Sequence, residues 1–178
     1  MPDWGSDGKA MILKRLFKQQ EKPERRLYAA IVAAARHKRF YQDMGVPDTI
    51  DGRFEMIVLH LFLVLNRLRN EGVEDLRQNL TDEFFADMDG SLRELGVSDV
   101  SVGKKVRKLE ESYFGRVMAY EKALGTPELL EEAISRNVFP DGAALGCQRA
   151  VAQYMVRASQ TLGGLPLEDI IRSELKFQ

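Results

Sequence analysis

The segment 56–65 constrains the fold more than any other part of the chain, because it is apolar at every position except His60. A membrane-spanning helix needs about 20 predominantly apolar residues, so this run is too short to cross a bilayer. It predicts instead a helix over residues 53–70 that is buried on most sides, with other helices packed around it. Within that helix we expect His60 to be a core histidine held by a hydrogen-bond partner.

Apolar residues recur at helical spacing along most of the remaining chain. This spacing predicts helices over residues 24–44, 74–95, 101–124, 126–138 and 143–162, and a short helix after Pro166. Asp48 or Asp51 is placed to cap the 53–70 helix. No segment alternates polar and apolar residues as a β-strand does. We therefore expect an all-α, single-domain irregular bundle of six to seven helices around a central apolar helix, formed by residues 24–178 and preceded by a flexible, short amphipathic basic segment, residues 1–23.

The net charge of −1 conceals a basic N-terminal quarter. Ten Lys and Arg residues lie between Lys9 and Tyr41, against two glutamates. Such an asymmetry favours an anionic partner such as phospholipid or RNA, although a solvated charged face is the simpler interpretation. A short amphipathic segment in this quarter is suited to docking at a membrane interface, through Ile12, Leu13, Lys14, Arg15, Leu16, Phe17 and Lys18.

The most enzyme-like feature is an acidic run in the predicted 74–95 helix, which contains Asp82, Glu83, Asp87 and Asp89. Terpenoid-type all-α enzymes hold Mg²⁺ and a diphosphate between two such clusters, with aspartates about one helical turn apart. Here Asp82 and Asp87 are five residues apart and no second cluster matches. A solvated acidic face is the favoured interpretation, and a terpenoid-type or other lipid-modifying enzyme is the alternative.

No other pattern indicates catalysis or metal binding. Cys147 is the only cysteine, and His37 and His60 do not share a ligand spacing. The sequence has no glycine-rich phosphate loop, nucleophile elbow or acid–base pair of carboxylates. We therefore expect a protein that is not an enzyme and holds no cofactor or metal. An RNA- or ribosome-docking adaptor is a further alternative, using Arg25, Arg26, Arg36, Lys38, Arg39, Lys104, Lys105, Arg107 and Lys108.

An ordered set of short strings, covering about residues 24–177, resembles the ubiquinol–cytochrome c chaperone family. The strings are Tyr28…Ala35-Arg36…Phe40-Tyr41, Pro47-Asp48-Thr49 with Phe54 and Leu59-His60, Arg67-Leu68 with Gly72, Arg93-Glu94-Leu95-Gly96-Val97, Phe114-Gly115-Arg116 with Ala119-Tyr120, and Arg136-Asn137-Val138-Phe139. Each string is short, and their common order makes the resemblance specific. The resemblance implies an all-helical, non-enzymatic assembly chaperone that binds newly made cytochrome b and promotes assembly of ubiquinol–cytochrome c reductase.

The resemblance also implies partners, a location and a set of contact residues. Mitochondrial relatives carry a targeting segment before this domain and involve a small partner protein and the ribosome. Here the leading segment is short and unlike a transit peptide, so we expect a bacterial cytoplasmic member, peripheral at the inner membrane, or at the matrix face if eukaryotic. The ribosome and an anionic membrane surface are further expected partners, and the small partner protein stays open. The expected client- or partner-binding residues are Tyr28, Arg36, Tyr41, Asp48, Arg53, His60, Arg116 and Tyr120.

Overall fold

A computed structural model describes residues 22–177 of the chain. These residues form helices and no β-strand, which confirms the predicted all-α class. The helices are α2 (Pro23–Ala35), α3 (Arg39–Gln42), α4 (Ile50–Arg67), α5 (Glu74–Glu94), α6 (Asp99–Ala123), α7 (Pro127–Val138), α8 (Cys147–Gly163) and α9 (Leu167–Ile171). The proposed membrane-docking residues 12–18 and nearly all of the expected N-terminal segment lie outside the described residues.

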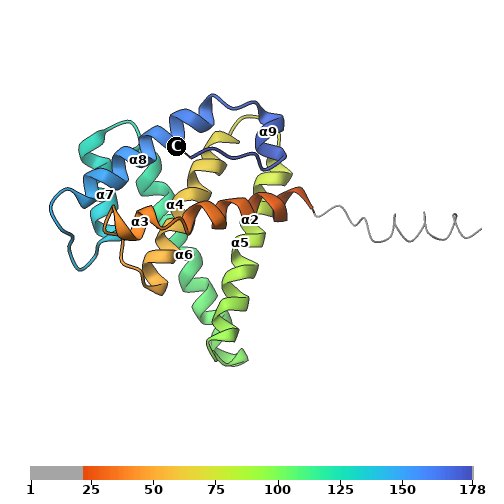
Figure 1. The fold of residues 1–178 in the computed structure, drawn as a ribbon. Coiled ribbons are helices and arrows are strands. Elements are labelled where there is room, and N and C mark those ends of the chain that lie inside the picture. The colour runs from red at the N-terminus through yellow and green to blue at the C-terminus, as the bar shows by residue number, and fades with distance from the viewer. Residues whose placement is uncertain (1–21, 178) are drawn as a thin grey trace, which may run out of the picture.

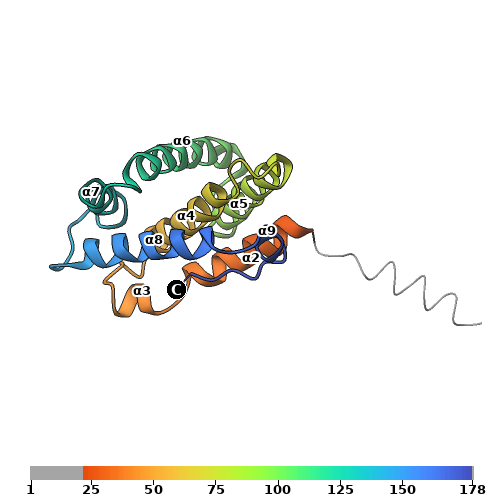
Figure 2. The ribbon, with the colours of Figure 1, turned by 90° about the horizontal axis from the view of Figure 1, so that it is seen from above.

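Helix α4 lies at the centre of the bundle, as its apolar sequence predicts. Seen from above, it runs between α5 and α6 on one side and α2 and α8 on the other (Figure 2). All ten residues from Glu55 to Val64 are buried, and Glu55 and His60 are the polar ones among them. A helix that is apolar around its whole circumference needs such neighbours on all sides, because any exposed face would leave apolar surface in water. Within residues 22–177, no helix is both long and apolar enough to span a membrane.

Helix α4 begins three residues earlier than predicted, and its cap is neither of the expected aspartates. The Thr49 hydroxyl oxygen accepts a hydrogen bond from the backbone N–H of Gly52 at 3.1 Å. Thr49 has an extended backbone, which is the usual conformation of a capping residue. Asp48 instead accepts a hydrogen bond from Nε of Arg53 at 2.7 Å. The cap was missed because three residues within four positions, 48, 49 and 51, carry side chains able to cap the helix.

The helix predicted over residues 24–44 is broken into α2 and α3. At the break, the Tyr41 hydroxyl donates to the carbonyl oxygen of Ala35 at 3.0 Å, satisfying a group at the end of α2. The Phe40 ring is buried between α4 and α8, with its centroid 5.3 Å from the ring of His60 and 4.8 Å from that of Tyr154. The chain turns between α2 and α3, and this turn places Phe40 in the core. Local periodicity alone predicts a continuous helix because it contains no information about this tertiary contact.

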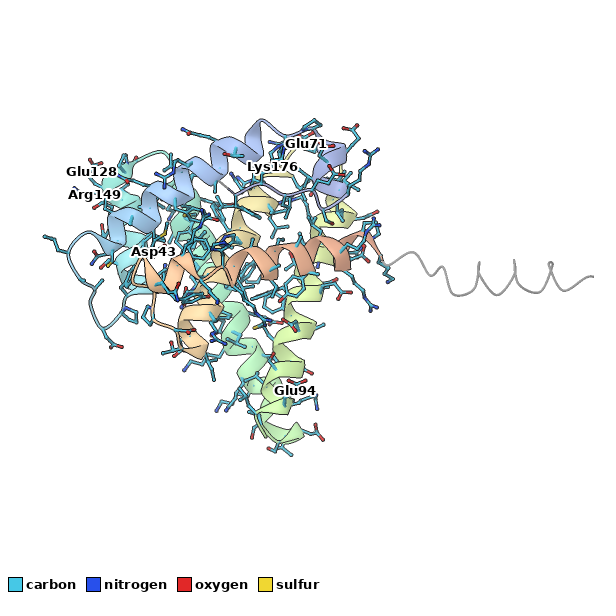
Figure 3. The ribbon with its side chains drawn as sticks, viewed as in Figure 1. Asp43, Glu71, Glu94, Glu128, Arg149 and Lys176 are labelled. Carbon is cyan, nitrogen blue, oxygen red and sulfur yellow. The ribbon has the colours of Figure 1, made fainter. Side chains whose placement is uncertain are left out.

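Helices α5 and α6 form a long pair whose connected ends extend beyond the rest of the bundle (Figure 1). Glu94, the last residue of α5, lies near this projecting end (Figure 3). The turn that follows uses Gly96 with a φ of +82°, a left-handed conformation that glycine adopts without strain. Among the described residues, these two helices alone form the projection, so no other described helix covers its outer surfaces.

The C-terminal part of the chain closes the bundle over α4. Nε and Nη2 of Arg67, at the end of α4, donate to the carbonyl oxygens of Leu162 and Leu165 at 3.0 and 2.9 Å. These bonds satisfy one carbonyl group in the last turn of α8 and one in the segment that follows it. The last described residues return toward the middle of the protein (Figure 1), where the Phe177 ring lies 4.9 Å from that of His60. The C-terminal end of the described chain thus packs into the core around α4.

Candidate functional site

A cleft of about 560 Å³ opens where α4 begins and α7 ends, and we call it the α4–α7 cleft. Its walls come from four parts of the chain that are far apart in sequence. They include Pro47, Thr49, Ile50, Phe54 and Glu55 at the start of α4, Met88, Leu92 and Leu95 of α5, Leu109, Ser112 and Arg116 of α6, and Arg136, Asn137, Val138 and Phe139 at the end of α7.

The α4 wall of the cleft depends on a close approach between two backbone segments. A Cβ atom at Gly52 would lie 1.9 Å from the carbonyl oxygen of Pro47, so no residue larger than glycine fits without moving the backbone. Pro47 holds the preceding residue in extended backbone, and Val46 is buried. The segment before α4 is therefore pressed against the first turn of the helix and forms one rim of the cleft.

Two large apolar side chains are exposed at the cleft. Ile50 is 68% exposed and Leu95 is 61% exposed, and they come from α4 and from the turn after α5. Phe54, half-buried, adds an aromatic ring to the same lining. Exposed apolar side chains of this size lose contact with water only when a partner covers them. The lining therefore suits an apolar helix or extended segment of another protein.

A buried ion pair between Glu55 and Arg116 joins α4 to α6 at the cleft. Nε of Arg116 lies 2.8 and 2.7 Å from the two carboxylate oxygens of Glu55, and Nη2 also contacts the carboxylate. Nη1 donates to the carbonyl oxygen of Ser112 at 3.0 Å. Burial raises the pKa of the Glu55 carboxyl, and the Arg116 guanidinium offsets part of this effect. Because its donors are already engaged, Arg116 shapes the cleft and is poorly placed to bind a second anion.

Of the eight residues expected to contact a client, Arg116 alone lines the α4–α7 cleft. Asp48 and Arg53 form an exposed ion pair next to lining residues, and Arg36 is exposed beyond the end of α2. Sequence reasoning missed Ile50, Glu55 and Leu95. The position of Glu55, directly before the apolar 56–65 run, was a signal that its carboxylate needs a partner. Leu95 lies within one of the family-like strings, which was a signal for a role at the surface. Nothing local distinguishes Ile50 from a core residue.

Three of the remaining expected contact residues are buried, and the fourth, Tyr41, is half-buried. His60 and Tyr120 have no exposed surface, and Tyr28 is buried. The Tyr28 hydroxyl donates to Asp87 at 2.7 Å and ties α2 to α5, while burial raises the pKa of this hydroxyl. Tyr41 is half-buried, and its hydroxyl donates to the carbonyl oxygen of Ala35. Tyr28, His60 and Tyr120 thus pack between helices, whereas Tyr41 keeps part of its surface exposed, and the contact of all four with a client stays a prediction.

The acidic run of α5 does not converge on one point. Each acid accepts a hydrogen bond at 2.7 to 2.9 Å from a different side chain: Asp82 from Gln78, Glu83 from Arg25, Asp87 from Tyr28 and Asp89 from Arg93. Within the described part of the chain, no group of three or more His, Cys, Asp or Glu residues is arranged to hold a metal ion. The four acids of this run are thus held by separate side chains and do not form the metal-holding cluster of a terpenoid-type enzyme.

Comparison with known proteins agrees with this geometry. Residues 42–177 match the family model described as ubiquinol–cytochrome C chaperone. A solved structure, described as the crystal structure of the Cbp3 homolog from Brucella abortus, is similar with a TM-score of 0.81 and 38% sequence identity, covering 95% of this chain and 96% of that one. The matched fold is thus the complete bundle rather than one part of it.

Two curated proteins, both called ubiquinol–cytochrome c reductase complex assembly factor 1, are also similar. The one from Xenopus laevis is 21% identical over 116 residues, which are 64% of this chain and 58% of that protein. The one from Drosophila melanogaster is 23% identical over 154 residues, which are 82% of this chain and 60% of that protein. The chain therefore spans less than two thirds of the length of these relatives.

Proposed function

This chain belongs to the ubiquinol–cytochrome c chaperone family, and from that membership we propose that it is a non-enzymatic assembly chaperone whose client is newly made cytochrome b. The two similar curated proteins are assembly factors of the ubiquinol–cytochrome c reductase complex, to which cytochrome b belongs. A chaperone of this kind needs a surface that covers an apolar segment for a limited time. It needs no reacting group.

The observation that carries the proposal is the composition of the α4–α7 cleft. Four of the family-like strings supply its walls, through Pro47 and Phe54, Leu95, Arg116, and the 136–139 segment. The cleft combines a fixed ion pair with exposed Ile50 and Leu95. Burying an apolar side chain of this size contributes about 1.5–3 kcal/mol, which supports reversible capture of a membrane-protein segment before its insertion.

A complementation experiment tests the role of the cleft. In a strain that lacks the gene, we expect Ile50→Asp and Leu95→Asp to restore assembled cytochrome b poorly, because each places a charge where an apolar segment must lie. Reduced-minus-oxidised spectra of the membranes measure the assembled complex. Leu145→Asp is the matched control, since Leu145 is fully exposed and lies outside the cleft. Normal cytochrome b levels with both cleft variants would overturn the cleft assignment.

Site-specific crosslinking tests the identity of the client. A photoreactive residue in place of Leu95 should form a product with cytochrome b during synthesis, whereas the same residue in place of Leu145 should not. Proteins must be expressed at equal levels and melt like the wild type. Products of equal yield at the two positions, or a product with a different protein at position 95, would contradict the proposed client.

We further propose that the protein works in the bacterial cytoplasm at the inner membrane, close to the ribosome that delivers the client. The basic amphipathic residues 12–18 support this placement, because apolar and cationic side chains alternate in a way that suits an anionic interface. Flotation with anionic vesicles is expected to weaken when salt is raised and when residues 9–18 are deleted. Vesicle binding that is unchanged by high salt and by the deletion would contradict a membrane role for these residues.

A further inference from the structure

The outer side of α6 carries three large exposed apolar side chains in one line. Successive residues of an α-helix are rotated by about 100°, so Val100, Phe114 and Met118 project from nearly the same side. They are 94%, 55% and 56% exposed. Figure 2 shows α6 along one outer edge of the bundle, with α4 on its inner side. The opposite side of α6 is buried through Val102, Tyr113 and Tyr120.

Basic side chains are interspersed with this apolar line, and together they form what we call the outer α6 face. Four exposed cations project from the same side of the helix: Lys104, Arg107, Lys108 and Lys122. None of them has an ion-pair partner within residues 22–177. Glu111 lies among them, while Glu121 at the edge is paired with Arg69. Counting Glu111 against the four cations, the outer α6 face keeps a net charge of +3.

We propose that the outer α6 face is a docking surface for an anionic lipid bilayer. Apolar side chains set among lysines and arginines are the pattern of helices that lie in the plane of a membrane interface. Each basic residue near an anionic surface contributes about 1 kcal/mol, and salt screens this attraction within about 10 Å. The four cations thus supply the attraction, while Phe114 and Met118 reach into the headgroup region.

The chemistry of the apolar side chains favours lipid over single-stranded RNA as the occupant. Non-specific RNA binding relies on aromatic rings on which successive bases stack. On the outer α6 face the exposed ring is that of Phe114, whereas Val100 and Met118 offer no surface for stacking. Apolar side chains without a polar atom, such as Val100 and the flexible Met118, are instead well suited to contact with acyl chains.

Docking through α6 also has a consequence for the proposed function. Leu109, Ser112 and Arg116 on another side of the same helix line the α4–α7 cleft. A helix with its side chains is about 10–12 Å across, so the cleft would lie within about one helix diameter of the bilayer. An apolar segment could then pass between membrane and cleft with little exposure to water. This consequence rests on the proposed function, whereas the docking surface does not.

A fluorescence experiment on the full-length protein locates the contact. In a Trp4→Phe background, Phe114→Trp reports on the outer α6 face and Leu145→Trp reports on an exposed position in the loop before α8. Vesicles of phosphatidylcholine and phosphatidylglycerol with brominated acyl chains should quench the tryptophan at 114 and leave that at 145 unquenched. Quenching at 145 alone, at both positions equally, or at neither would overturn the proposal.

Charge reversal then tests the electrostatic part. Lys104→Glu/Arg107→Glu/Lys108→Glu should weaken binding to the same vesicles at least about tenfold, given the contribution of each cation. Arg157→Glu/Arg172→Glu/Lys176→Glu changes the net charge equally at exposed cations of α8 and the C-terminal segment, and should change binding much less. Equal losses of vesicle binding in the two triple variants would overturn the lipid assignment. So would an α6 triple variant that keeps its vesicle affinity but no longer binds a short single-stranded RNA. The complementation assay with Leu95→Asp tests the cleft independently of vesicle binding, so a failure of the docking surface and a failure of the proposed function give different results.

Discussion

Nε2 of His60 lies 2.6 Å from the hydroxyl of Tyr154, joining α4 to α8 at the centre of the protein. Nδ1 of the same ring lies 2.7 Å from the carbonyl oxygen of Met56, which can only accept. Nδ1 therefore carries the proton, and Nε2 accepts from Tyr154. Burial lowers the pKa of His60 to about 4 and raises the pKa of Tyr154 to about 12, so both side chains are neutral near pH 7.

The His60 contact predicts a loss of stability in mild acid. A histidine in the unfolded chain has a pKa of about 6.5, so between pH 6.5 and 4 the unfolded state binds a proton that the folded state does not. The free energy of unfolding should thus be unaffected by His60 above pH 6.5 and fall as the pH is lowered to about 4, by on the order of 3 kcal/mol.

Chemical denaturation at a series of pH values measures this effect. His60→Gln should flatten the dependence between pH 6.5 and 4, because the amide does not titrate. His37→Gln is the matched control, since His37 is the other histidine and is exposed. Identical pH profiles for the wild type and His60→Gln would show that His60 is not the titrating group.

The two ion pairs near the start of α4 should differ sharply in their contribution to stability. Arg116→Ala leaves the Glu55 carboxylate buried without its guanidinium, and we expect the free energy of unfolding to fall by about 3–5 kcal/mol. Arg53→Ala removes an exposed pair with Asp48 that water screens, so it should change the free energy of unfolding far less. Urea unfolding measures both. Adding Glu55→Leu to Arg116→Ala should recover part of the loss, and a further fall would contradict the unpaired-charge explanation.

Two glycine-to-alanine substitutions should have opposite signs. At Gly52 the new Cβ would meet the Pro47 carbonyl oxygen at 1.9 Å, so we expect a loss of at least about 1–3 kcal/mol from forced backbone movement. At Gly90, within α5, the Cβ would meet nothing within 4 Å, and alanine should stabilise the helix by about 0.5–1 kcal/mol. Thermal melts of the two variants decide this, and a stabilised Gly52→Ala protein would contradict the close approach.

The central position of α4 gives a further prediction. Leu61 has no exposed surface, so Leu61→Asp places an unpaired carboxylate in the core and should abolish cooperative unfolding. Leu61→Ala should retain the fold and lower the free energy of unfolding by about 2–5 kcal/mol. Leu145→Asp, at an exposed position, should melt like the wild type. Circular dichroism with thermal melting distinguishes these outcomes, and a cooperatively melting Leu61→Asp protein would place the core elsewhere.

The sequence by itself determined the helical class and the identity of the central helix. Both follow from patterns within a few turns of chain, because the 3.6-residue repeat decides which side chains share a face. The apolar 56–65 run had no polar face to turn toward water, so it had to be buried wherever the other helices lay. The starts of α5 and α7 and the turn at Gly96 were likewise predictable, since local residue types decide them.

Only the tertiary structure decided the break between α2 and α3 and the composition of the cleft. Phe40 packs against His60 and Tyr154, residues 20 and 114 positions away, and local periodicity carries no information about either contact. Glu55 meets Arg116 across 61 residues. Ile50 looks like a core residue in the sequence and becomes an exposed side chain of the cleft because none of the described helices packs over it. Such outcomes depend on how all the helices fill space together, whereas helix periodicity depends on neighbours a turn or two away.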